Sequence, residues 1–130
     1  MKITIMYDEG EKSPFRTFFD IAKEWGLSEI EQQSLLAVSK ESFFKLKRHA
    51  NGEVQNVVIS SRLLRRTTFV KGIHGSLAVL FSEKTSRVWV GTPNKNPLFK
   101  GKSPLELMCH GDANAGLEVV SRHLVGAIVH

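Results

Sequence analysis

Residues 97–108 read PLFKGKSPLELM, and this stretch decides how the C-terminal half of the chain folds. Ser103 is a good N-cap, Pro104 occupies the first helical position, and Glu106 completes a capping box. In such a box the serine and glutamate side chains satisfy backbone N–H groups at the helix start. The stretch therefore predicts a loop that turns directly into a short, capped helix.

The residues on both sides of this stretch also predict helices. The preceding loop, 92–97, contains two prolines and two asparagines, and Ser82 before it caps a helix that carries Trp89. The final helix is expected from apolar residues spaced by three, four and four, namely Leu117, Val120, Leu124 and Ile128. The C-terminal half is therefore expected to be entirely helical.

The N-terminal half begins with Ser13 and Pro14, an N-cap followed by a proline in the first helical turn. Two short helices are predicted next, over 28–37 and 39–49, with the first starting at a capping box and carrying Ile30, Leu35 and Leu36 on its buried face. A tight turn around Val38 joins them. This length and spacing is typical of a helix-turn-helix, whose second helix lies in the DNA major groove.

A long helix is expected from about Asn56 to Phe81. Its apolar stripe has helical spacing and consists of Ile59, Leu63, Val70, Ile73, Leu77 and Leu80. Gly72 and Gly75 interrupt the middle, which predicts close packing of a neighbouring helix there. Residues 2–7 alternate weakly and are compatible with a short strand.

Together these elements predict an all-α fold. We expect an N-terminal arm over 1–13, a helix-turn-helix domain over 14–70 and a C-terminal domain over 71–130, connected by the long helix.

The charge is concentrated in one segment. The chain has a net charge of +5, and residues 40–71 hold eight basic and two acidic side chains, a balance of +6. A localised basic surface attracts polyanions. The candidates for contacts to base edges are Ser39, Lys40, Glu41, Ser42 and Lys45, and those for phosphate contacts are Lys47, Arg48, Arg62, Arg65 and Arg66. The alternative is a plain helical hairpin with a solvated charged face.

The sequence argues against an enzyme. None of its five histidines has the spacing of a metal pair on one helix face, and we expect no metal and no cofactor. A weaker alternative is a small enzyme that uses a histidine and Cys109. The single cysteine agrees with a reducing compartment, and no apolar run approaches the length that spans a bilayer, so we expect a cytoplasmic protein without membrane contact.

An ordered set of C-terminal motifs resembles the toxin-binding domain of Xre/MbcA/ParS-type antitoxins. The set comprises Trp89-Val90-Gly91-Thr92-Pro93-Asn94, Pro97-Leu98-Phe99-Lys100-Gly101-Lys102-Ser103-Pro104-Leu105-Glu106-Leu107-Met108, Gly111-Asp112 and Gly116-Leu117-Glu118-Val119-Val120. Gly26-Leu27-Ser28 and Leu35-Leu36-Ala37-Val38-Ser39 are similar to the helix-turn-helix of that family. The resemblance covers roughly residues 15–128.

The resemblance implies an antitoxin of a type II toxin–antitoxin pair. Such an antitoxin binds over the active site of a RES-domain toxin that depletes NAD, represses its own operon through the helix-turn-helix and forms a homodimer. The motif residues with expected structural roles are Trp89, Asn94, Phe99, Gly101, Ser103, Pro104 and Glu106. The polar residues expected to face the toxin are Glu118, Arg122, His123 and His130. The alternative is a stand-alone helix-turn-helix regulator that uses its C-terminal domain for dimerisation.

Overall fold

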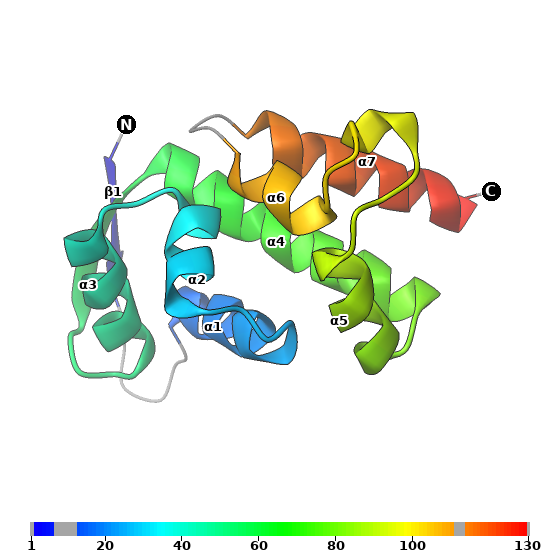
Figure 1. Ribbon diagram of the computed structural model, residues 1–130. Coiled ribbons are helices and arrows are strands. Elements are labelled where there is room, and N and C mark those ends of the chain that lie inside the picture. The colour runs from blue at the N-terminus through cyan, green and yellow to red at the C-terminus, as the bar shows by residue number, and fades with distance from the viewer. Residues whose placement is uncertain (1, 7–12, 111–113, 130) are drawn as a thin grey trace.

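A computed structural model describes residues 2–6, 13–110 and 114–129 of the chain. The described residues form mostly helices, with one small two-stranded sheet (Figure 1). In chain order the elements are β1 (Lys2–Met6), α1 (Pro14–Glu24), α2 (Glu29–Leu36), α3 (Lys40–Ala50), β2 (Asn56–Ser60), α4 (Ser61–Leu80), α5 (Glu83–Gly91), the 3-10 helix η1 (Pro97–Phe99), α6 (Pro104–Cys109) and α7 (Ala115–Val129).

Serine caps start the helices where the sequence predicted them. Each cap side chain accepts a backbone N–H from the first turn of its helix, and these residues are Ser13, Ser28, Ser39, Ser82 and Ser103. The capping boxes of α2 and α6 are both formed, with Glu31 and Glu106 as their reciprocal partners. A cap of this kind contributes about 1 kcal/mol of helix stability. The predicted helix starts are therefore confirmed.

Helix α4 is the central element of the molecule. It contacts α1, α2 and β2 on the N-terminal side and α5 and α7 on the C-terminal side (Figure 1). Its buried side chains Val70, Ile73 and Leu77 join one hydrophobic core with residues of α1 and α7, such as Phe18 and Leu124. One helix thus connects the part that carries α2 and α3 to the part that carries α6 and α7.

The prediction of one helix from Asn56 to Phe81 is wrong over its first five residues. These residues form β2, and the helix α4 starts at Ser61 with Ser60 as its N-cap. Three consecutive β-branched residues, Val57, Val58 and Ile59, favour an extended backbone. The wrong prediction arose because Ile59 and Leu63 are four residues apart, a spacing that also occurs on one face of a helix.

The strand β2 pairs with β1 in an antiparallel sheet. The expected all-α fold is therefore correct for the helices but omits this small sheet. The register places Lys2 opposite Ser60, Ile3 opposite Ile59 and Thr4 opposite Val58. The expected N-terminal arm therefore includes a strand, as its weak alternation allowed. Its residues 7–12 lie outside the described residues.

Three expected core features are also wrong. Ile30 is 78% exposed, because it lies five and six positions from the buried Leu35 and Leu36 and so points to another side of α2. Ile128, expected on the buried face of α7, is exposed near the helix end. At Gly72 and Gly75 an added Cβ would meet no atom within 4 Å, so these glycines do not mark close helix packing.

The predicted boundary between residues 70 and 71 falls within α4, and the division into two domains stays a prediction. Across the described ranges, no helix combines the length and the apolar character needed to cross a membrane.

Candidate functional site

The exposed surface of α3 carries the residues predicted to read DNA. Glu41, Lys45 and Arg48 are spaced by four and three residues, so they share one ridge of the helix. Lys40 and Ser42 flank this ridge, and all of these side chains, together with the cap Ser39, are exposed. The structure therefore brings six of the seven predicted base- and phosphate-contacting residues of this helix, all except Lys47, onto one accessible surface, which we call the α3 surface.

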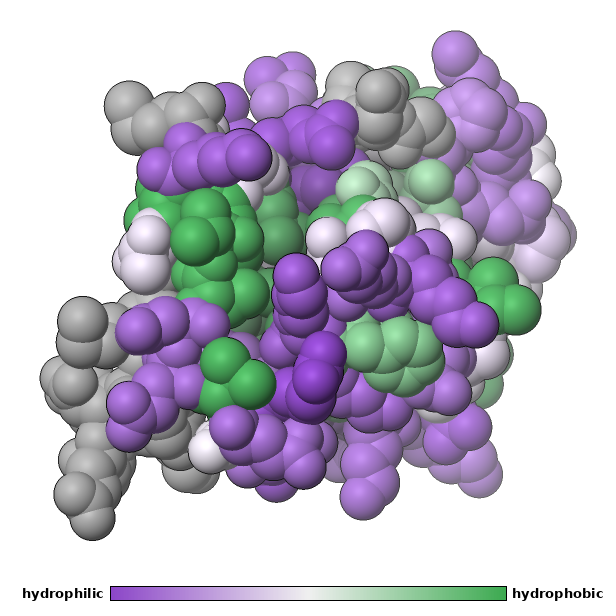
Figure 2. Space-filling model, turned by 90° about the vertical axis from the view of Figure 1, so that its left-hand side faces the viewer, coloured by the Kyte–Doolittle hydropathy of each residue, from purple (hydrophilic) through white to green (hydrophobic). Residues whose placement is uncertain are grey.

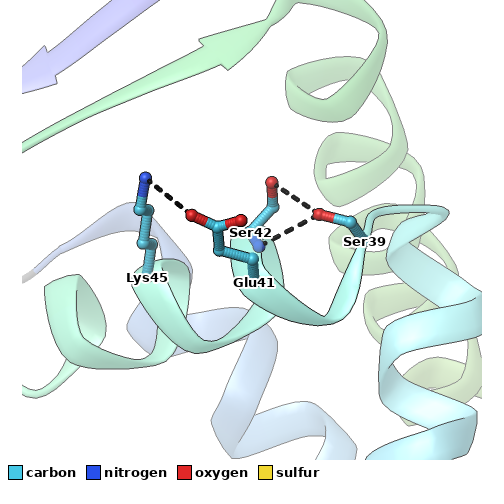
Figure 3. A network of polar contacts seen from close by, with 4 residues as sticks. All are labelled: Ser39, Glu41, Ser42 and Lys45. Atoms are coloured by element: carbon cyan, nitrogen blue, oxygen red, sulfur yellow. Dashed lines mark hydrogen bonds and ion pairs between the residues drawn. The ribbon is translucent and has the colours of Figure 1, made fainter.

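Hydrogen bonds order the start of the α3 surface (Figure 3). The Ser39 hydroxyl accepts a hydrogen bond from the Ser42 backbone N–H at 3.2 Å and donates one to the Ser42 hydroxyl at 3.1 Å. One turn later the Lys45 ammonium lies 3.7 Å from the Glu41 carboxylate. Both groups of that pair are largely exposed, so the pair contributes little stability and leaves both side chains able to exchange partners.

A turn and one surface ion pair connect α3 to α2. Ala37 takes a left-handed conformation, with a φ of 56°, and ends α2. Between the two helices, the Lys47 ammonium of α3 lies 2.9 Å from the Glu29 carboxylate of α2 and 5.9 Å from the Phe43 ring centroid. Lys47 was predicted as a phosphate contact, but its ammonium is engaged with α2. Buried Phe43 and Leu46 hold the opposite side of α3 in the core.

A groove separates the α3 surface from β2. Two neighbouring cavities of about 310 and 370 Å³ both involve Lys45, Val57 and Val58. Viewed from this end of the molecule, hydrophobic surface gathers beside a region of hydrophilic side chains (Figure 2). Figure 3 shows Ser42 and Lys45 pointing toward the space in front of the sheet. The sheet therefore forms one wall beside the α3 surface, which the sequence did not predict.

Two further predicted phosphate contacts lie at the start of α4. Arg62 and Arg65 are exposed and, with Ser61 and Asn114, line a cavity of about 380 Å³. The first turn of α4 adds backbone N–H groups and the positive end of the helix dipole. Each guanidinium group can bind a phosphate in bidentate fashion. Both groups lie near a helix N-terminus, which favours anions.

Arg66 is the one predicted phosphate contact that the structure rules out. It is fully buried, and its guanidinium donates hydrogen bonds to the carbonyl oxygens of Leu35 and Met108, each at 2.8 Å, and to Asn114 Oδ1 at 3.3 Å. Burial lowers the pKa of this guanidinium below its ordinary value. The residue connects the end of α2 to the end of α6, so its long side chain serves the fold and has no access to DNA.

The C-terminal motif residues form a loop, a turn and a small aromatic cluster. Asn94 Oδ1 accepts a hydrogen bond from the Asn96 backbone N–H at 2.9 Å, and Gly101, with a φ of 80°, provides the turn before buried Ser103 and Pro104. The aromatic residues of the motif, Trp89 and Phe99, have ring centroids 6.1 Å apart. These contacts explain the motif residues by capping, turning and packing.

The four predicted toxin-facing residues differ in their exposure. Arg122 is exposed on α7, whereas Glu118 is half-buried. His123 is half-buried and packs against the aromatic cluster, with centroid distances of 6.3 Å to Trp89 and 5.1 Å to Phe99. His130 lies outside the described residues.

Sequence reasoning missed the exposed apolar residues of α7. Val125, Ile128 and Val129 are 49%, 40% and 70% exposed. Val125 and Val129 continue the spacing from Arg122 by three and four residues, so they lie on one side of the helix. We call Arg122, Val125, Ile128 and Val129 the α7 surface. The sequence could have predicted this exposed apolar surface, because its residues fall outside the buried stripe of Leu117, Val120 and Leu124.

Three side chains with catalytic potential, Ser13, His49 and Cys109, lie wholly or partly inside the fold, whereas His74 and Glu24, whose side chains are 2.9 Å apart, are partly exposed. Ser13 Oγ lies 2.6 Å from His49 Nδ1, but both residues are buried and Ser13 also caps α1. Burial raises the pKa of the Cys109 thiol to about 11, which keeps it protonated and weakly nucleophilic at neutral pH. Within the described parts of the chain, no group of three or more His, Cys, Asp or Glu residues could hold a metal ion.

The structure presents two candidate binding surfaces, the α3 surface and the α7 surface, carried by helices near opposite ends of the molecule (Figure 1). The first is polar and mostly basic, and the second combines one cation with three apolar side chains. No protein-family model and no curated protein matches this chain.

Proposed function

We propose that this chain is the antitoxin of a type II toxin–antitoxin pair. In this proposal the α7 surface binds a RES-domain, NAD-depleting toxin over its active site, and the helix pair α2–α3 acts as a helix-turn-helix that represses the operon. The chain itself catalyses nothing and needs no cofactor. It acts in the cytoplasm, away from membranes.

The observation that carries the toxin-binding part is the exposure of Val125, Ile128 and Val129 beside Arg122. Apolar side chains grouped on one exposed helix favour contact with a partner, since covering them removes apolar surface from water. Arginine beside such residues is common where proteins bind each other. This group belongs to the C-terminal half, where the family resemblance is most specific.

The DNA-binding part is supported by the exposed ridge of Glu41, Lys45 and Arg48 on a helix held at its N-terminus by a serine cap. A recognition helix needs a protruding, polar side with a fixed base, and the core contacts of Phe43 and Leu46 supply that base. Arg62 and Arg65 add exposed cations at the start of α4.

The toxin-binding part is tested first by searching for a RES-domain reading frame beside the gene, and then by co-expressing its product with the chain. We expect a stable complex and protection of cellular NAD. The double variant Val125→Asp, Val129→Asp places two charges in the contact and should abolish both. The matched control is Ile30→Asp, an exposed apolar residue at the other end of the molecule, which should leave neutralisation intact. Full neutralisation by a folded α7 double variant would contradict the proposal.

The DNA-binding part is tested with a fragment of the chain's own promoter across a salt series. Replacing Lys45 and Arg48 by alanine should weaken binding and flatten the dependence of log K on log salt by about one unit per lost phosphate contact. The control replaces exposed Lys84 and Lys95, which removes the same charge from another region. Equal losses in both double variants would indicate general charge attraction and contradict a role for the α3 surface.

The stand-alone regulator makes a different prediction in the same experiments. It binds the promoter through the α3 surface but forms no complex with a RES-domain protein. Promoter binding without any toxin binding would therefore replace the antitoxin proposal with this second function.

A further inference from the structure

Among the residues that the structure describes, nothing pairs with the β1 side of the small sheet. Within the described residues the sheet contains only β1 and β2, and β2 also packs against α3 and α4. No described residue outside β2 forms a backbone hydrogen bond to residues 2–6. The outer edge of an antiparallel strand presents alternate N–H and C=O groups that can pair with another strand.

We propose that this edge binds the same edge of a second copy of the chain. The two β1 strands then run antiparallel about a two-fold axis and form a four-stranded sheet in the order β2–β1–β1–β2. Antiparallel pairing of identical edges is isologous, so it closes as a dimer and leaves no further edge of β1 exposed. The interface includes no residue of the α7 surface.

The register centred on Thr4 fits this arrangement best. It gives the largest overlap of two five-residue strands and pairs each Thr4 with Thr4 of the second copy. Because Val58 lies opposite Thr4 in the sheet, the exposed side chains then form a row of valine, threonine, threonine and valine across four strands. Cross-strand pairs of β-branched residues of this kind stabilise sheets.

The charges favour the same register. Lys2 lies two residues from the axis, so the two Lys2 residues of the dimer are four residues apart along the strands, or about 13 Å. This separation exceeds the Debye length of about 8 Å at physiological salt. A register centred on residue 2 would place the two lysines directly opposite each other and is disfavoured.

The identity of the occupant follows from this self-complementarity. In this register Thr4 lies opposite Thr4, Ile3 opposite Ile5 and Lys2 opposite Met6, so the same five residues supply both sides of the contact without placing like charges opposite each other. Two short strands cover less surface than the roughly 1,200 Å² of a standard stable interface, so we expect self-association in the micromolar range or weaker. Two adjacent half-sites on DNA would raise the effective concentration and strengthen it.

This inference deepens the proposed function by naming the surface that forms the homodimer, but its test needs neither DNA nor toxin. Sedimentation velocity of the full chain from about 1 to 500 μM should show a reversible monomer–dimer equilibrium. Thr4→Lys places two cations at the axis and should weaken the dimer about fivefold or more. Thr17→Lys, at an exposed threonine of α1, is the matched control and should have no effect.

A mixture of Thr4→Lys with Thr4→Glu restores opposite charges at the axis. We expect this mixture to dimerise more strongly than either variant alone. A dimer that is unchanged by Thr4→Lys, or a wild-type chain that stays monomeric throughout, would overturn the inference. Circular dichroism of each variant establishes that the helices remain folded.

A cysteine cross-link tests the register directly. Opposed residues in antiparallel strands have Cα atoms about 4.5 to 5.5 Å apart, within the range that a disulfide spans. In a Cys109→Ala background, Thr4→Cys should give a covalent dimer under an added disulfide oxidant such as oxidised glutathione, and Thr17→Cys should not. In this exchange two thiols form one disulfide and glutathione is reduced. Equal cross-linking at both positions would reflect random collision and refute the register.

Discussion

Replacement of Arg66 by methionine should destabilise the protein strongly. The guanidinium donates to Leu35 O and Met108 O, which lie in the last turns of α2 and α6, and to Asn114 Oδ1. Carbonyl groups in a last helical turn have no partner within their own helix. Arg66 therefore satisfies the ends of two helices and places a positive charge at the negative ends of their dipoles.

The magnitude follows from what methionine leaves behind. A hydrogen bond from a charged donor contributes about 1.5 to 3 kcal/mol, so these three bonds together correspond to about 5 to 9 kcal/mol. Methionine removes a buried charge and regains about 2 kcal/mol through its apolar side chain. We expect a net loss of about 3 to 5 kcal/mol, because the carbonyl acceptors stay buried without donors.

Thermal unfolding followed by circular dichroism measures this effect. For a chain of this length 1 kcal/mol corresponds to about 3 to 4 °C, so the midpoint should fall by about 9 to 20 °C. Arg65→Met is the matched control, since it makes the same change at an exposed neighbouring position and should alter the midpoint by less than about 2 °C. A midpoint of Arg66→Met at or above that of the wild type would refute the reasoning.

Three further predictions concern single residues of the C-terminal half. A Cβ at Gly116 would overlap the carbonyl oxygen of Leu107, so Gly116→Ala should lower the unfolding midpoint markedly, whereas Gly126→Ala, where no atom lies within 4 Å, should raise it slightly through helix propensity. Because burial raises the pKa of Cys109 from 9.0 to about 11, the folded state favours the thiol. The free energy of unfolding should be insensitive to this group below about pH 9 and should decrease between pH 9 and 11. Denaturant titrations over this pH range should show a smaller decrease for Cys109→Ala than for the wild type. His123→Ala should cost about 1 kcal/mol or more of stability through lost aromatic contacts, and toxin affinity unchanged in the folded variant would agree with that packing role.

Features encoded within a few residues were predictable from the chain alone. The box of Ser28 and Glu31 and that of Ser103 and Glu106 each join groups three residues apart, so no distant contact is needed to form them. The same holds for the exposed ridge of Lys45 and Arg48, whose side follows from helical spacing once the buried residues are known.

Features that need a partner far along the chain were not predictable. In residues 56–60 the spacing of Ile59 from Leu63 fits a helical stripe, whereas the β-branched residues favour a strand, and pairing with β1, 50 to 58 positions away, decides between them. Arg66 follows an exposed arginine in the sequence, yet it is buried because α2 and α6 bring two carbonyl groups to one point. His123 occupies the polar part of its helix and was assigned to a partner, whereas the aromatic rings of Trp89 and Phe99 cover it.

The sequence by itself determined where the helices begin, which of their faces are apolar and where the basic charge is concentrated. Capping, helical periodicity and charge density act between neighbours, so these properties require only the local chain. The tertiary structure alone decided which polar side chains are buried, that the N-terminal strand completes a sheet, and that apolar residues of α7 remain exposed. Those outcomes depend on packing between distant segments, where burial without a hydrogen-bond partner is costly and each side chain is placed by the elements around it.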